Sequence, residues 1–200
     1  MPRKPLIRTS DFPYHVTTRS NHKEWFKIPL DEVWEISVNA FHYALKKYHV
    51  EIYQYVLMHN HYHMLIRTPE SNIDKFMYLF NKDFSEKLRS KSGYVNRMFG
   101  GNYHPSLITD DRYLQTAFRY VYQNPVRARM VGRAENYPYS TLFFLERNIG
   151  TPFPIVLPEI FGQKINHSEL SSTLLSEDEV LSIRKGFQKE KFKEVFPRKY

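Results

Sequence analysis

One stretch, residues 53–67, constrains the fold more than any other part of the 200-residue chain. Two runs rich in aromatic and branched side chains flank a polar centre, Met58-His59-Asn60. This pattern is typical of two antiparallel strands joined by a short turn. Because side chains alternate along a strand, His61 and His63 share one face and Tyr62 lies on the other. The two imidazoles are therefore close enough to hold one metal ion.

A His-x-His pair on a strand is weak support for metal binding when it stands alone. The chain has nine histidines, so some close pairs arise by chance, and a structural role is the commoner one. The absence of cysteine excludes disulfides, thiolate zinc sites and cysteine nucleophiles. A metal would have to be held by imidazole, carboxylate or amide groups, which leaves Mg²⁺ and Mn²⁺ open.

The elements around this hairpin follow the order strand, helix, strand, strand, helix, strand. We expect a strand at residues 12–18, a helix at 29–48, paired strands at 50–58 and 61–68, a helix from residue 71, and a bent strand within 95–108. This is the order of split β-α-β, ferredoxin-like folds. The predicted class is α+β: a ferredoxin-like antiparallel sheet with helices packed on one face, the other face open, and a C-terminal helical extension.

A third helix is expected after the start signal Thr109-Asp110-Asp111. Tyr120 and Asn124 are four residues apart and therefore share one face of this helix, which Tyr122 does not. We expect the helical geometry to be disturbed near Asn124, because Pro125 disfavours helical backbone angles in the residue before it.

Positive charge points to the kind of partner. The 29 Lys and Arg residues against 21 Asp and Glu give a net charge of +8 and a pI near 9.5. A polyanion is the expected partner, most simply nucleic acid, with an acidic membrane surface as the competing reading. The basic N-terminal arm fits a phosphate-gripping segment and a solvated terminus equally well.

We expect the chain to comprise two parts, a domain and an extension. We also expect it to remain inside the cell. Prolines at 150–161 mark a linker, so we expect a catalytic domain over residues 1–149 and an extension over 150–200. Ser176 and Glu179 match a capping box that opens a basic helix, for packing, DNA contact or dimerisation. No apolar run is long enough to span a membrane and no signal-peptide core precedes the domain. A cytoplasmic, nucleoid-associated location is expected.

Four blocks in order resemble the single-tyrosine HUH transposases (IS200-like), and among them the REP-associated tyrosine transposases. They are residues 14–21, 56–66, 119–128 and 137–140, within a match of about residues 5–147. The resemblance implies a ferredoxin-like fold, DNA transposition and recombination, and a divalent metal, Mg²⁺ or Mn²⁺. The chain departs from the family at His59, where proline is usual, and at Asn102, where arginine is common.

The resemblance also assigns roles to residues. Tyr120 matches the nucleophile, His61 and His63 match two metal ligands, and Asn124 matches the third. Attack by the tyrosine would form a covalent 5′-phosphotyrosine and release a 3′-hydroxyl, which allows rejoining without ATP. The implied partner is single-stranded DNA with a REP-like hairpin, bound by a monomer or a homodimer. Contacts to DNA are predicted at Arg3, Lys4, Arg8, Arg19, Asn21, Arg119 and Arg127.

Other functions remain open at this stage. A non-catalytic module on the same fold would bind single strands by aromatic stacking, although the chain lacks the Lys/Arg-Gly-aromatic run of RNA-recognition motifs. A metal hydrolase using His61 and His63 would release free ends and never attach to DNA. A domesticated DNA-nicking enzyme lies between these readings. For His59 we expect a plain turn residue rather than a spare ligand or a DNA contact.

Overall fold

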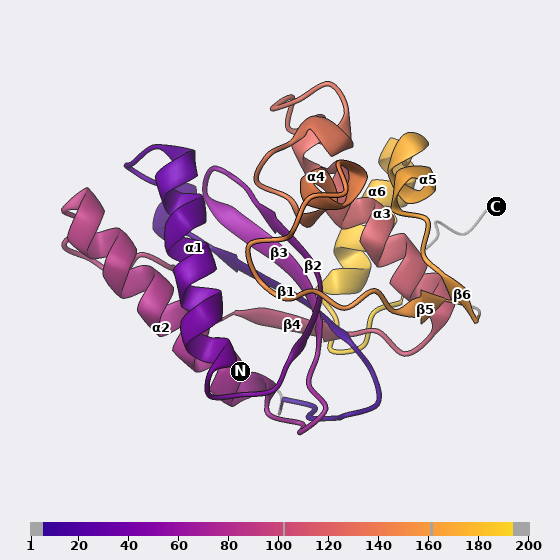
Figure 1. Ribbon diagram of the computed structural model, residues 1–200, viewed down its shortest axis with the longest axis horizontal. Helices are drawn as coiled ribbons and strands as arrows, with labels where there is room; N and C mark the ends of the chain where they lie inside the picture. Colours follow the sequence, from indigo (N-terminus) through magenta and orange to yellow (C-terminus); the bar gives the residue numbers. More distant parts are fainter. Residues whose placement is uncertain (1–5, 102, 161, 194–200) are drawn as a thin grey trace.

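The computed structural model describes residues 6–101, 103–160 and 162–193. Its centre is an antiparallel sheet in the order β2-β3-β1-β4 (Figure 1). The strands are β1 (Tyr14–Arg19), β2 (Glu51–Leu57), β3 (His61–Arg67) and β4 (His104–Leu107). With helix α1 (Leu30–Leu45) after β1 and α2 (Ile73–Ser92) after β3, the connection order confirms the predicted α+β, ferredoxin-like fold. No helix in the described ranges is long and apolar enough to cross a membrane.

The central hairpin is confirmed. Leu57 lies opposite Tyr62, and the Met58 N–H donates to the His61 carbonyl at 2.8 Å across the turn. Tyr62 enters the apolar cluster beneath α1 and α2, whereas Leu65 enters the cluster on the other face. A one-residue shift would exchange these faces, so the alternation fixes the register. It also leaves His61 and His63 on the face away from α1 and α2.

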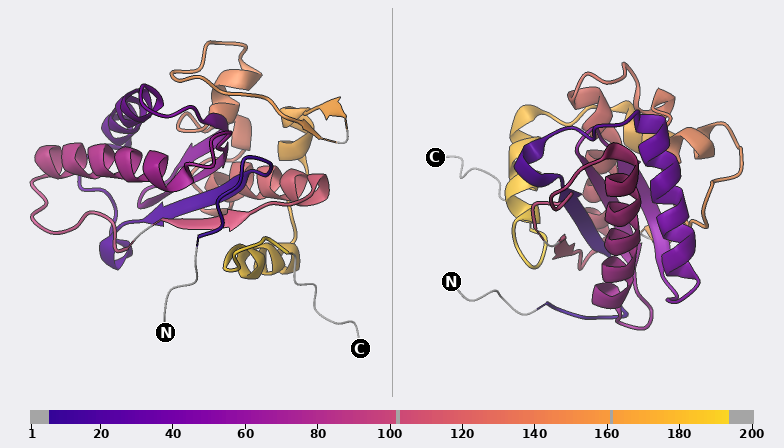
Figure 2. Two further views of the ribbon diagram at one scale, coloured as in Figure 1. Left: turned by 90° about the horizontal axis from the view of Figure 1, so that it is seen from below. Right: turned by 90° about the vertical axis from the view of Figure 1, so that its left-hand side faces the viewer.

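The second face of the sheet is covered, which corrects the expectation of an open face. Helix α3 (Asp111–Arg127) crosses it, and the chain after residue 149 returns to the same side (Figure 2). Helix α4 (Thr141–Glu146) precedes this return, and the returning chain forms β5 (Glu159–Ile160), β6 (Gln163–Lys164), α5 (His167–Ser172) and α6 (Glu177–Phe187). Ile183 and Phe187 of α6 are buried in one cluster with Val121 of α3. Burial of this apolar surface favours the closed arrangement, at about 25 cal/mol per Å².

The C-terminal segment shares both apolar clusters. Phe153 is buried beneath α1 and α2, and Phe192 is buried beneath α3 and α6. The predicted capping box at Ser176 and Glu179 opens α6 and is confirmed. Gly186 gives the returning chain room, because a Cβ there would lie 2.5 Å from the Lys193 carbonyl oxygen. The division at residue 149 stays a prediction.

Helix α3 continues through Pro125, contrary to the expected weakening near Asn124. Beyond the proline, the Ala128 N–H donates to the Asn124 carbonyl at 2.9 Å. Residues 120–125 are all buried, so packing against both the sheet and the C-terminal segment outweighs the local preference. Tyr120 and Asn124 therefore stay one rigid turn apart.

Candidate active site

Three histidines meet on the sheet face beneath α3. His61 and His63 come from β3, with ring centroids 5.0 Å apart. His15 comes from β1, and its Nε2 lies 2.8 Å from Nδ1 of His63. The structure thus brings the predicted pair together and adds His15, which the sequence reading did not select. The alternation of β1 placed His15 on one face with Arg19, but the pairing of β1 with β3 is not visible in the sequence.

Burial keeps all three imidazoles neutral. It lowers the pKa of His15 and of His61 to about 3, and the pKa of His63 well below its ordinary value. The positive charges of Arg19 and Arg184 lower the pKa of His61 and His63 further. A neutral imidazole is the form that binds a metal ion.

The remaining ring nitrogens suit a divalent cation. Asn60 uses its Nδ2 to donate to the Lys23 carbonyl, so its Oδ1 accepts from Nδ1 of His61 at 2.7 Å. Nε2 of His61 is then left with its lone pair. Nε2 of His63 is left in the same state when its Nδ1 donates to His15. Such outer hydrogen bonds orient metal-binding imidazoles, so the donor set fits the expected ion.

Tyr120 faces this cluster from α3. Its ring centroid lies 5.8 Å from that of His63, with the rings perpendicular. The side chain is 5% exposed, and its hydroxyl has no hydrogen-bond partner among the described residues. One turn later, Asn124 donates its Nδ2 to the Tyr120 carbonyl at 3.1 Å, which leaves Oδ1 as a potential ligand. In the described ranges no three His, Cys, Asp or Glu residues are grouped so that they could hold one metal ion.

Tyr122 contacts His167 instead of the cluster formed by His15, His61 and His63. It is 1% exposed, and its hydroxyl lies 2.9 Å from Nδ1 of His167. Burial raises the pKa of this phenol above its ordinary value. A buried and hydrogen-bonded phenol cannot reach a phosphate, so of these two tyrosines only Tyr120 faces His63.

The predicted DNA contacts near the N-terminus are scattered. Arg3 and Lys4 lie outside the described residues. Arg8 forms an ion pair with Asp74 at 2.9 Å, on the opposite side of the sheet from the histidines. Asn21 packs against the 98–100 loop, with its N–H bonded to the Met98 carbonyl. Only Arg19, exposed and opposite His61 in the β1–β3 pairing, borders the cluster.

The two predicted arginines of α3 hold the C-terminal segment. Arg119 donates to the Thr173 carbonyl at 3.3 Å, and Arg127 donates to the Leu175 carbonyl. Between them Gln123 donates to the Thr173 carbonyl at 2.7 Å and accepts from the Leu175 N–H at 2.9 Å. Binding of DNA by Arg119 and Arg127 stays a prediction, and their observed partners are in the protein.

Helix α6 contributes two residues that the sequence reading missed. Phe187 stacks on His15 with centroids 3.8 Å apart and lies 5.4 Å from the Tyr120 ring. Arg184 lies one turn earlier and is exposed. The amphipathic spacing of α6 was visible in the sequence, but nothing local indicates which surface that helix covers.

His59 lies outside the cluster. Its ring centroid lies 4.3 Å from that of the exposed Trp25, and its carbonyl accepts from the Phe26 N–H at 2.9 Å. These contacts tie the β2–β3 turn to the loop after β1.

A family model and several solved structures match the chain. The model, described as transposase IS200-like, matches residues 8–124, which is more than half of the chain and contains the histidines, Tyr120 and Asn124. A REP-associated tyrosine transposase bound to a REP hairpin superposes with a TM-score of 0.63 at 14% identity, covering 82% of this chain and 97% of that one. A putative transposase from Deinococcus radiodurans R1 gives 0.40 at 11% identity, covering 76% and 98%. None of the curated proteins compared matches the chain.

Proposed function

The chain belongs to the family of IS200-like transposases, and from this premise we propose that it cleaves and rejoins single-stranded DNA through Tyr120. The observation that carries the proposal is the position of Tyr120, whose ring faces the neutral imidazole of His63 at 5.8 Å. The similar fold of a transposase bound to a REP hairpin supports a hairpin-containing substrate.

In the proposed reaction the Tyr120 oxygen attacks the phosphorus of a phosphodiester. The phenol gives up its proton to solvent as the bond between its oxygen and phosphorus forms, the bond from phosphorus to the 3′-oxygen breaks, and that oxygen takes a proton from solvent and leaves as a 3′-hydroxyl. The 5′ end stays on the protein as a phosphotyrosine. A 3′-hydroxyl from another strand can then attack this phosphotyrosine and restore the tyrosine, so rejoining needs no ATP.

A divalent cation, Mg²⁺ or Mn²⁺, fits the donors His61 Nε2, His63 Nε2 and Asn124 Oδ1. When bound, it would polarise the non-bridging phosphate oxygens and stabilise the charge of the transition state. His15 holds the His63 ring in place, and Phe187 covers His15 and one side of Tyr120. All these groups lie within one chain, which supports a site complete in a monomer.

Covalent trapping tests the proposal. The protein is mixed with labelled single-stranded hairpin DNA, with Mn²⁺ or with a chelator, and resolved on a denaturing gel. We expect a protein–DNA band only with the metal. Cleaved DNA without this band would favour a metal hydrolase. Binding without any cleavage across a broad hairpin set would favour a non-catalytic module.

Replacing Arg184 should slow formation of the covalent product. We expect Arg184→Gln to lower its rate by about 10-fold, because the guanidinium lies beside the histidines where a phosphate would carry charge. The neighbouring Lys185→Gln removes the same charge from the same exposed helix and is the matched control. The rate is measured by trapping at saturating DNA. An equal loss of rate in both variants would show that only the net charge of the protein matters, and it would contradict a specific role for Arg184 beside the histidines.

A further inference from the structure

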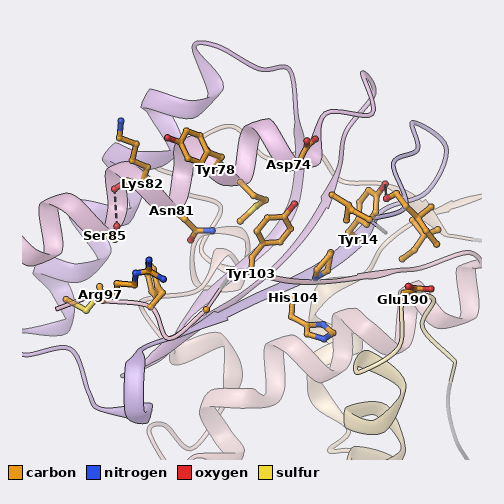
Figure 3. A pocket seen from close by; sticks show the side chains of 18 of the residues that line it. Tyr14, Asp74, Tyr78, Asn81, Lys82, Ser85, Arg97, Tyr103, His104 and Glu190 are labelled. Atoms are coloured by element: carbon orange, nitrogen blue, oxygen red, sulfur yellow. Dashed lines mark hydrogen bonds between the residues drawn. The ribbon is translucent and has the colours of Figure 1, made fainter. Parts of the chain in front are cut away.

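A groove of about 970 Å³ lies between α2 and β4 (Figure 3). Its floor includes Met77, Phe99 and Leu107, which belong to the apolar cluster beneath α1 and α2. The groove therefore opens on the opposite side of the sheet from Tyr120. An apolar floor with a few polar groups at the rim is the usual composition of a ligand site.

The rim carries charge that suits a phosphate at one end. Lys82 and Arg97 gather there, and Arg89 also lines the groove (Figure 3). In the described ranges none of these three cations has an ion-pair partner. Glu86 and Glu190 line the groove too, with Glu190 at the far end (Figure 3). Glu86 lies about one helical turn from both Lys82 and Arg89 on α2, so the cationic end carries one carboxylate against three cations.

Two tyrosines and an amide stand over the floor. Tyr78 of α2 is 63% exposed, and Tyr103, in the chain just before β4, also lines the groove (Figure 3). Asn81 lies between them and accepts from the Tyr62 hydroxyl through Oδ1 at 2.7 Å. Its Nδ2 is left to donate to a ligand. Aromatic faces next to cations are the usual means of holding unpaired nucleotides.

The groove lies along the edge strand β4, which is paired with β1, and β1 is paired in turn with β3, the strand that carries His61 and His63. Thr17 of β1 is paired with His63 on one side and with His104 of β4 on the other. His104 is therefore two strand spacings, about 10 Å, from His63, and it also lines the groove. The far end of β4 is closed by backbone bonds from Leu107 to Glu190 and Phe192. At the His104 end the chain stays on β1, where the Gly100 N–H donates to the Arg19 carbonyl at 3.2 Å, so a DNA strand in the groove would have to cross this edge of the sheet to reach Tyr120.

We propose that this groove binds one unpaired nucleotide of the DNA strand next to the cleavage site. The base lies against Tyr78 and Tyr103, the Asn81 amide donates to its edge, and a phosphate lies at Lys82 and Arg97. The identity of the ligand rests on the proposed function, but binding in the groove requires no cleavage.

Fluorescence anisotropy on a Tyr120→Phe background measures this binding without turnover. The ligand is a hairpin oligonucleotide with single-stranded flanks. Tyr78→Ala and Arg97→Gln should each weaken binding by about 5- to 10-fold. The matched controls are Tyr43→Ala and Lys47→Gln, exposed residues at or beyond the C-terminal end of α1, which should bind as the parent does.

Abasic substitutions, made one position at a time, locate the base. At one position the loss of the base should weaken binding to the parent but not to Tyr78→Ala. Parent-like binding by both groove variants would overturn the proposal, as would losses equal at every DNA position. Binding of free deoxynucleoside monophosphates that tracks the variants, without position dependence in DNA, would also overturn it. If the wild-type protein binds DNA but never forms an adduct, the chemistry of Tyr120 fails while the groove result stands.

Discussion

Tyr120→Phe is expected to abolish the covalent protein–DNA product. The change removes one oxygen, the proposed nucleophile, and should lower the yield of the trapped band at least about a thousandfold. Among the described residues that hydroxyl has no hydrogen-bond partner, so the free energy of unfolding should change by less than about 0.5 kcal/mol. Trapping on a denaturing gel and chemical unfolding measure the two quantities.

Tyr122→Phe, two residues away, should give the reverse pattern. It removes the hydrogen bond to His167 Nδ1, and the other ring nitrogen of His167 already lacks a partner in the described structure. Leaving the buried imidazole unpaired should cost about 1–3 kcal/mol of stability. The covalent band should persist, because this phenol contacts His167 and not His61 or His63. A band lost in Tyr122→Phe and kept in Tyr120→Phe would show that the wrong tyrosine has been assigned.

The resemblance to a family supplied the roles of the site residues, and local periodicity predicted which of them share a face. His61 and His63 share a face because strands repeat every two residues, and Tyr120 and Asn124 share a face because helices repeat every 3.6. Both relations hold in the structure. The break expected near Asn124 failed because the preference before proline is also local, whereas the burial that overrides it is not.

What the sequence could not show depends on contacts between distant segments. His15 meets His63 through the β1–β3 pairing, and α6 reaches His15 only after the 49 residues 128–176, which contain no long helix in the described ranges. Arg119 and Arg127 show that the partner of a charged residue also depends on distant segments, because both donate to backbone carbonyls of the C-terminal segment. The sequence alone does not distinguish a basic residue that binds a phosphate from one that donates to a backbone carbonyl. Net charge indicates the class of partner, but it does not select the residues that touch it.

The metal site can be tested without DNA. Removing the His63 imidazole should lower the affinity for Mn²⁺ by more than about 100-fold, because it deletes one of three proposed ligands. The measurement is a Mn²⁺ titration followed by electron paramagnetic resonance of the free ion. His42→Ala, at an exposed position on α1, is the control and should bind Mn²⁺ as the wild type does. Equal affinity in His63→Ala and the control would remove the metal from this site.

His15 should influence the binding of the same ion indirectly, through its hydrogen bond to the proposed ligand His63. Its Nε2 holds Nδ1 of His63, so His15→Ala should weaken Mn²⁺ binding by about 10- to 100-fold. His15→Gln keeps an oxygen that can accept from the His63 N–H and should restore part of the affinity. If both variants bind Mn²⁺ normally but unfold more easily, His15 serves only to pack against Phe187. Rescue by glutamine alone would instead show that the hydrogen bond, rather than the volume of the ring, positions the ligand.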